Sequence, residues 1–281
     1  MKSSILSTAA IALTISIFTS CNNTNKEVSS ETNSGAESNT PAETPMKVIT
    51  LSDFSASPDF PDAQLAIKDV KTEMKGKDSV KVTISYNVKG YELKHQTESD
   101  IAKECNNSKD GQHIHFILDN TPYAALYEPT RSFVVPVNSK HYVMSFLSRS
   151  YHESLKNKNA GVLLYFSVNE KGVYKKLDNP QNPMIFYSRP KGDYAGNDTQ
   201  NILLDFYVYN ATLSPNGNKV KASINDSTFT LDTWKPTFIQ NAPMGALKVK
   251  LELLDKDGNT VSGENTVIER TVQLAAETPT K

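Results

Sequence analysis

Cysteine is scarce in this chain, with only two among its 281 residues. Cys21 directly follows an apolar segment, and Cys105 lies in a polar stretch far from it. If processing consumes Cys21, then Cys105 has no partner within the chain. This excludes a small scaffold held together by disulfides, whichever compartment the protein occupies.

An excess of charge of either sign is also lacking, because 30 Lys and Arg stand against 31 Asp and Glu. A protein that binds nucleic acid electrostatically would show a basic face or stripe. We therefore expect no nucleic-acid partner. The 12 Tyr and 11 Phe, together with few long apolar helical patterns, favour β structure.

Signatures of common enzyme classes are absent as well. The chain has no Gly-x-Ser-x-Gly nucleophile elbow and no phosphate-binding Gly-rich loop after a strand. Residues 152–156 lack the second histidine of a zinc-protease helix. We expect a non-catalytic protein, and an enzyme with an unrecognised site stays open as an alternative.

Residues 1–20 have the pattern of an export signal, with Lys2 before an apolar segment that is too short to span a bilayer. The segment ends in residues 18–21, Phe-Thr-Ser-Cys, which resemble the lipobox of bacterial lipoproteins. This resemblance implies lipidation of Cys21, with ordinary secretory cleavage near Ser20 as the alternative. Acyl chains would anchor the protein by burying CH₂ groups, each contributing about 0.8 kcal/mol.

The chain after Cys21 is rich in Ser, Thr, Asn and Glu and has almost no large apolar residues. Such a segment cannot bury enough surface to fold, so residues 21–45 are predicted to be a lipidated, disordered linker. The predicted location is the cell envelope, at the periplasmic or surface face of the outer membrane.

From residue 46 onward, short alternating runs are separated by turn residues. Residues 79–88 alternate apolar and polar side chains, as a half-buried strand of an antiparallel sheet does. Residues 219–226 align without a gap with residues 113–120, and residues 249–253 align with 143–147. Both matches share an offset of about 106 residues, which indicates an internal repeat.

The repeat predicts an all-β fold of two tandem immunoglobulin-like antiparallel β-sandwiches. The first, which carries the histidines, is expected at residues 46–180, and a linker and the second sandwich at 181–281. The junction is expected at residues 180–196, where residues 184–187 could instead form an edge strand packed between the two. A single large sandwich or barrel is the alternative.

All five histidines lie between residues 95 and 152. His113 and His115 are separated by one residue on a predicted strand, so both side chains point to the same face, opposite the core. Two neighbouring imidazoles on a strand are a common start of a Zn or Cu site. The candidate metal ligands are His113, His115, His141 and His152.

Two residues outside this set could complete such a site, namely Glu153 beside His152 and the thiolate of Cys105. Other interpretations stay open. The face of the strand that carries His113 and His115 could be a solvated surface, or the histidines could act without a metal. The repeat bears on this choice, because its second copy has Lys219 and Lys221 at the corresponding positions. The fold therefore does not require imidazole there.

Two loops combine an arginine with a tyrosine and small hydroxyl side chains. The first contains Arg149 and Tyr151, and the second contains Arg189 and Tyr194. A guanidinium group with neighbouring hydroxyls can bind a carboxylate, a phosphate or a sugar. Both loops are candidate ligand-binding loops, and turn chemistry with surface charge is the alternative.

Residues 111–115, 118–123, 148–154 and 187–192 resemble segments of uncharacterised envelope lipoproteins of the Bacteroidota type. Some of these carry the label "phosphopeptide-binding protein", for which this sequence shows no recognition module. The chain is also similar, more faintly, to a small periplasmic domain of unknown function with a His-His-His-Leu-Leu-Ile-Asp segment. Neither resemblance implies catalytic residues.

The sequence therefore predicts a membrane-anchored envelope lipoprotein that acts as a non-catalytic binding or scaffolding module. Its partners would be the membrane, through the lipid on Cys21, and an envelope protein or glycan. The alternative is a periplasmic lipoprotein that binds Zn or Cu through the histidines of the first sandwich.

Overall fold

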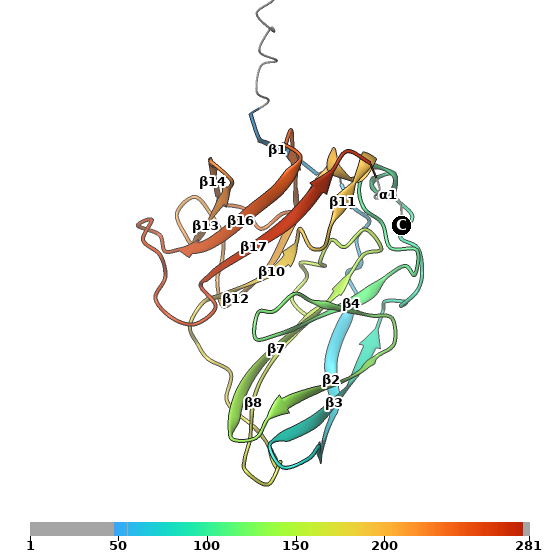
Figure 1. Ribbon diagram of the computed structural model, residues 1–281, viewed down its shortest axis with the longest axis vertical. Helices are drawn as coiled ribbons and strands as arrows, with labels where there is room; N and C mark the ends of the chain where they lie inside the picture. Colours follow the sequence, from blue (N-terminus) through green and yellow to red (C-terminus); the bar gives the residue numbers. More distant parts are fainter. Residues whose placement is uncertain (1–47, 55, 278–281) are drawn as a thin grey trace, which may run out of the picture. The chain divides into compact units, whose positions relative to one another are not determined.

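The structure is a computed structural model that describes residues 48–54 and 56–277. In this part of the chain the strands form two packed pairs of sheets (Figure 1). The predicted all-β fold of two immunoglobulin-like sandwiches is confirmed. The predicted signal peptide (1–20), the lipidation site Cys21 and the linker (21–45) lie outside the described residues.

The first sandwich combines a three-stranded sheet with a five-stranded sheet. The smaller sheet runs in the order β2 (Gln64–Met74), β3 (Ser79–Lys89), β6 (Thr130–Pro136). The larger sheet runs in the order β5 (Ala124–Leu126), β4 (His113–Leu118), β7 (Ser139–Ser148), β8 (Gly161–Val168), β9 (Tyr174–Lys176). The connection from β3 to β4 contains the short helix α1 (Ile101–Glu104). Among the described residues, no helix has the length and apolar character needed to cross a membrane.

Alternation along the strands builds the core of the first sandwich. Successive side chains of a strand point to opposite faces, so every second residue of β3 is buried. This row consists of Val80, Val82, Ile84 and Tyr86. The strand β4 contributes Ile114 and Phe116 to the same core from the other sheet.

The second sandwich combines a four-stranded sheet with a five-stranded sheet. The smaller sheet runs in the order β1 (Thr50–Asp53), β15 (Thr237–Gln240), β12 (Ile202–Tyr209), β10 (Met184–Arg189). The larger sheet runs in the order β11 (Tyr194–Ala195), β17 (Val267–Ala275), β16 (Gly245–Leu254), β13 (Lys219–Ile224), β14 (Ser227–Leu231). A 3₁₀ turn, η1 (Gly196–Thr199), follows β11.

The strand β1 falls in the range expected for the first sandwich, 46–180, but it belongs to the second. It pairs antiparallel with β15, with Thr50 opposite Gln240. Ile49 and Leu51 pack into the core of the second sandwich. The predicted boundary is wrong for this strand. The strand β1 pairs with a segment that lies far along the chain, at residues 237–240. Local sequence patterns do not indicate such long-range pairing.

The internal repeat is present in the strand pairing. The ladder between β4 and β7 places His113 opposite Ser148. The ladder between β13 and β16 places Lys219 opposite Leu254, with both residues 106 positions further along the chain. The two sandwiches therefore share one strand register in this region, which confirms the sequence alignment.

The turns after these strands repeat as well. Asp119 and Asn225 both adopt positive φ angles, of 48° and 47°. The Oδ1 atom of Asp119 accepts a hydrogen bond from the backbone N–H of Tyr142. The Oδ1 atom of Asn225 accepts one from the N–H of Lys248, at the corresponding position. Short polar side chains suit such left-handed positions because they bond locally to the backbone.

The strand β10 is buried at every position, because both of its faces are covered. Ile185 and Tyr187 point into the core of the second sandwich. Met184 and Phe186 point the other way, into a cluster that joins the two sandwiches. The expectation that residues 184–187 form an edge strand packed between the two units is thus confirmed. We call the joining set the interface cluster; its buried members are Ile117, Tyr123, Met144, Phe146, Leu163, Met184, Phe186 and Tyr207.

The interface cluster covers the outer faces of β4 and β7. Ile117 of β4 and Phe146 of β7 point away from the first core and into this cluster. The alternative of a solvated outer face for β4 is therefore wrong. His113 and His115, on the same face as Ile117, are both 0% exposed.

Tyr207 provides a test of the interface cluster. It stacks on Phe146 with ring centroids 4.9 Å apart and lies edge-on to Trp234 at 4.8 Å. We expect Tyr207→Ala to lower the free energy of unfolding by about 3–5 kcal/mol, as for other large buried aromatic truncations. Chemical denaturation followed by the fluorescence of Trp234 measures this loss.

Tyr165→Ala is the matched control for Tyr207→Ala, because Tyr165 is a half-buried tyrosine of β8 that does not belong to the interface cluster. Its expected cost is below about 1 kcal/mol. Equal losses for the two variants would contradict a stabilising role of the interface cluster.

Candidate metal centre

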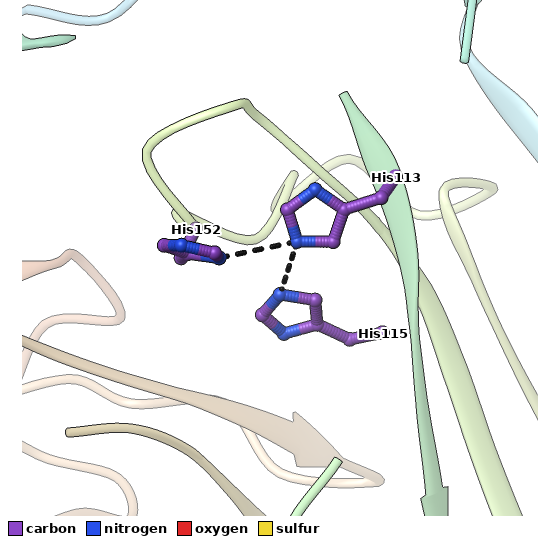
Figure 2. A group of neighbouring side chains, drawn as sticks. All are labelled: His113, His115 and His152. Carbon is purple, nitrogen blue, oxygen red and sulfur yellow. Dashed lines mark hydrogen bonds between the residues drawn. The ribbon is translucent and has the colours of Figure 1, made fainter. Parts of the chain in front are cut away.

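Three histidines lie close together beside the interface cluster. His113 and His115 occupy alternate positions of β4, and His152 lies in the turn that follows β7. One ring nitrogen of each lies within 4.8 Å of the others. Figure 2 shows the three rings turned toward one another. We call this group the histidine triad.

The ring nitrogens of His113 and His115 that face away from the centre of the triad have protein partners. His113 Nδ1 lies 2.8 Å from the carbonyl oxygen of Gly111, and His115 Nδ1 lies 3.0 Å from Ser188 Oγ. The carbonyl oxygen only accepts, so Nδ1 of His113 carries the proton and its Nε2 offers a lone pair. Metal-binding histidines are typically oriented through the second ring nitrogen in this way.

Two of the three distances between the inner nitrogens are close to those that a metal ion requires. His113 Nε2 lies 2.9 Å from His115 Nε2 and 3.2 Å from His152 Nδ1. A tetrahedral ion with metal–nitrogen distances of about 2.0–2.1 Å would place its ligand nitrogens roughly 3.3–3.4 Å apart. The two short distances lie close to this spacing, whereas the nitrogens of His115 and His152, within 4.8 Å of each other, would have to approach by as much as about 1.4 Å to bind one ion.

The backbone of His152 is unusual. Its φ angle is 70°, in the left-handed region where a non-glycine residue is uncommon. The corresponding residue of the second sandwich, 106 positions later, is Gly258, with a φ angle of 86°. The turn thus favours glycine, and a histidine there carries a backbone cost of about 1–2 kcal/mol. Residues kept in such conformations tend to occur at functional sites.

Aromatic rings enclose the triad. Tyr123 stacks on His115, with ring centroids 3.6 Å apart and planes inclined by 10°. Its hydroxyl lies 3.2 Å from His152 Nδ1. Tyr127 packs against His113 with centroids 5.1 Å apart. These contacts account for the burial of all three histidines.

Burial keeps the triad neutral. Desolvation lowers the pKa of His113 to about 4. Desolvation also lowers the pKa values of His115 and His152 well below their usual range. The positive charges of Arg189 and Lys191 act in the same direction on all three. Neutral imidazole is the form that binds metal ions, so the triad is ready to do so at pH 7.

No family model matches this chain, and no curated protein matches it either. A comparison with solved structures finds the fibronectin(III)-like modules of Clostridium thermocellum CbhA, at 9% sequence identity and a TM-score of 0.24. The match covers 76% of this chain and 95% of that one. At this level of likeness, the site has to be interpreted from its own geometry.

His141 is not part of the triad. The prediction that four histidines form one metal site is therefore wrong for His141. Its Nδ1 lies 2.6 Å from Asp119 Oδ2, and its Nε2 lies 2.7 Å from Ser139 Oγ. The antiparallel register explains this placement. Because His113 pairs with Ser148 at one end of β7, His141 lies beyond the opposite end of β4.

Cys105 and Glu153 do not complete the triad. Cys105 is buried with Tyr151 and Phe238, and burial raises the pKa of its thiol to about 12. The carboxylate of Glu153 pairs with Arg149 at 3.2 Å and accepts a hydrogen bond from Ser57. Both residues therefore have structural partners away from the three rings.

The first arginine loop has internal partners, and Arg149 and Glu153 also line a pocket of about 610 Å³. Arg149 is 5% exposed, pairs with Glu153 and donates a hydrogen bond to the carbonyl oxygen of Pro58. Tyr151 is fully buried and donates to Ser57 Oγ at 2.9 Å. These contacts fasten the turn that carries His152 to the segment before β2.

The second arginine loop lies beside the triad. Arg189 donates a hydrogen bond to the hydroxyl of Tyr194 at 3.0 Å and to the carbonyl oxygen of Lys191 at 3.1 Å. Its guanidinium also lies over the ring of Tyr123, 5.5 Å from the centroid. The structure thus brings together three of the four predicted histidines and this predicted loop.

Sequence reasoning missed two partners of the triad, Tyr123 and Ser188. Both lie in segments that carry the resemblance to envelope lipoproteins, residues 118–123 and 187–192. No pattern of residue types marked them as neighbours of the histidines. Ser188 is 73 residues from His115 in the chain, and only the packing of β10 brings them together.

The neutral triad makes folding stability dependent on pH. The unfolded chain has histidines with ordinary pKa values of about 6.5 and binds more protons than the folded protein below that pH. Stability is therefore complete above about pH 6.5 and falls as the pH drops, by roughly 1.4 kcal/mol per pH unit for each buried histidine. For His113 the loss ends near its folded pKa of about 4.

Chemical denaturation of metal-free protein at about pH 7, 6 and 5 measures this dependence. We expect His113→Gln to flatten the pH dependence of stability. His95→Gln, which alters an exposed histidine, is the matched control and should leave it unchanged. A slope in the His113→Gln variant as steep as in the unaltered protein would contradict the assignment.

Proposed function

We propose that this protein is a non-catalytic binding lipoprotein of the cell envelope, anchored by lipid on Cys21, and that it binds a transition-metal ion through His113, His115 and His152. The observation that carries the metal proposal is the convergence of three neutral imidazoles within 4.8 Å. The outer nitrogens of His113 and His115 already have oxygen partners that would orient them toward an ion.

The internal repeat supports a dedicated role for these residues. The three corresponding positions of the second sandwich hold Lys219, Lys221 and Gly258. The second sandwich adopts the same register and turns without any imidazole there. The histidines are therefore not needed to form the strand or the turn, and His152 even carries a backbone cost.

The donor set favours Zn²⁺ or Cu²⁺. Imidazole nitrogens suit these ions, and the thiol of Cys105, which would favour softer ions, lies elsewhere. Three histidines leave one coordination position of a tetrahedral ion free. The hydroxyl of Tyr123, 3.2 Å from His152 Nδ1, is a protein oxygen beside the triad that could approach that position.

Burial supports binding rather than catalysis at this site. His113 and His115 are 0% exposed, and His152 is 7% exposed. A substrate would need access to a metal-bound water, and the stacked ring of Tyr123 covers His115. A buried ion would hold β4, the turn after β7 and β10 together, since Ser188 of β10 orients His115.

Metal titration of the full-length protein in detergent tests this proposal. After treatment with a chelator, we expect one equivalent of Zn²⁺ or Cu²⁺ to bind, as measured by calorimetry for each ion separately. His113→Gln and His152→Gly should each weaken binding by more than about 100-fold, the upper limit for loss of an outer-shell partner. His152→Gly suits this test because the turn accepts glycine at the corresponding Gly258.

Two histidine variants outside the triad serve as controls. His95→Gln and His141→Gln should retain the affinity of the unaltered protein, because neither residue belongs to the triad. Equal weak binding by the unaltered protein and by His113→Gln would exclude the metal site. Binding that depends on His141 as strongly as on His113 would exclude the triad as its location.

The anchor is tested independently of the metal site. We expect the unaltered protein to sediment with membranes, and Cys21→Ser to move it to the soluble fraction, because the acyl chains attach to that thiol. Cys105→Ser removes the other cysteine and is the control, which should stay with the membranes. A Cys21→Ser variant that remains lipid-labelled and membrane-bound would contradict the predicted lipobox.

A further inference from the structure

Three cationic side chains gather at β10 and β17 without acidic partners. They are Arg189, Lys191 and Arg270, and no carboxylate oxygen among the described residues lies within ion-pair distance of them. Arg189 is 5% exposed. Lys191 and Arg270 are half-buried. A buried charge is normally paired, so a cluster of cations that includes the buried Arg189 and has no carboxylate among the described residues favours the binding of an anion.

The hydrogen bonds of these cations leave donors unused. Arg189 donates from NH1 to Tyr194 and to the backbone of Lys191, but its buried Nε–H has no partner among the described residues. Arg270 donates to the carbonyl oxygens of Asn120 and Glu269, and its Nε–H is also buried with no partner in residues 48–54 and 56–277.

Tyr187, beneath the guanidinium of Arg270, has a buried hydroxyl that likewise lacks a partner in the described part of the chain. Native proteins satisfy most buried polar atoms, and each exception calls for an explanation such as a missing ligand or water. Unpartnered donors on two arginines and a tyrosine occur here within one short stretch of β10 and the facing part of β17.

A pocket of about 290 Å³ lies at this place. Lys191 and Arg270 line it together with an apolar surface formed by Pro122, Pro190, Tyr187 and Val272. Its volume is at the lower end for ligand pockets, which fits a small molecule. The mixture of two cations and an apolar wall fits a molecule with one anionic group and a short apolar body.

We propose that this pocket binds a small organic anion, a carboxylate whose charged group contacts Lys191 and Arg270 and whose apolar part packs on Pro122, Pro190 and Val272. Charge-assisted hydrogen bonds from lysine and arginine are among the strongest available to a carboxylate. The anion would also compensate part of the charge of Arg189, whose chain neighbours Ser188 and Pro190 line the pocket.

The pocket adjoins the histidine triad but does not depend on it. Ser188 lines the pocket and also bonds to His115, and Lys191 lies over the ring of Tyr123, 4.5 Å from the centroid. The proposed contacts to the anion come from β10, β17 and the loop after β10. The pocket proposal therefore stands without the metal proposal, and chelator-treated protein should still bind the anion.

Binding of benzoate to the full-length, chelator-treated protein in detergent tests the proposal. Calorimetry should show saturable binding of benzoate, and the neutral amide benzamide, of the same shape, should bind at least about tenfold more weakly. Inorganic phosphate, which lacks the apolar part, should also bind more weakly than benzoate. The comparison of benzoate with benzamide needs no protein variant, so it does not depend on the folding of a mutant.

Lys191→Gln should weaken benzoate binding by at least about tenfold, because it removes one charged contact. Lys248→Gln is the matched control, since it removes the charge of an exposed lysine on β16, outside the pocket. Thermal unfolding confirms that both variants are folded.

Four results would overturn the proposal, and the last of them concerns the class of the ligand. One is the absence of saturable benzoate binding up to about 10 mM. A dissociation constant above that concentration would be too weak for a specific site. The second is equal binding of benzoate and benzamide. The third is an equal effect of Lys191→Gln and Lys248→Gln. Phosphate binding as tight as benzoate binding would overturn the organic class of the ligand.

Discussion

The packing of β10 between the two sandwiches is the constraint on which the rest of the structure depends. Successive side chains of β10 pack on opposite sides. Ile185 packs into the core of the second sandwich, and Phe186 packs into the interface cluster. This packing buries the outer face of β4. Polar side chains on that face then need partners, and β10 supplies one through Ser188, which bonds to His115.

The repeat separates what the fold requires from what was added to it. In the region of the triad both sandwiches use one ladder register and corresponding turns, so the second sandwich forms this strand and this turn without histidines. The first sandwich differs by three imidazoles, one of them at a left-handed position that its copy fills with Gly258. Stability alone would favour glycine there, so the histidine supports a binding role.

Electrostatics link the triad to the neighbouring pocket. Arg189 and Lys191 help to keep the histidines neutral, which preserves their lone pairs for a metal ion. The same cations repel a bare metal ion, and an anion beside them would reduce that repulsion. The proposed anion pocket and the proposed metal site are thus compatible neighbours, although their proposed ligands have opposite charge.

The sequence by itself determined the alternation of the strands, the two-sandwich fold, the 106-residue repeat and the shared face of His113 and His115, because these depend on local patterns. Only the tertiary structure decided which histidines meet. His152 joins His113 because the turn after β7 returns to the start of β4, whereas His141 is carried to the far end by the antiparallel register. The pairing of β1 with β15 and the contact of Ser188 with His115 were likewise beyond local patterns, since long-range packing depends on how distant surfaces fit together.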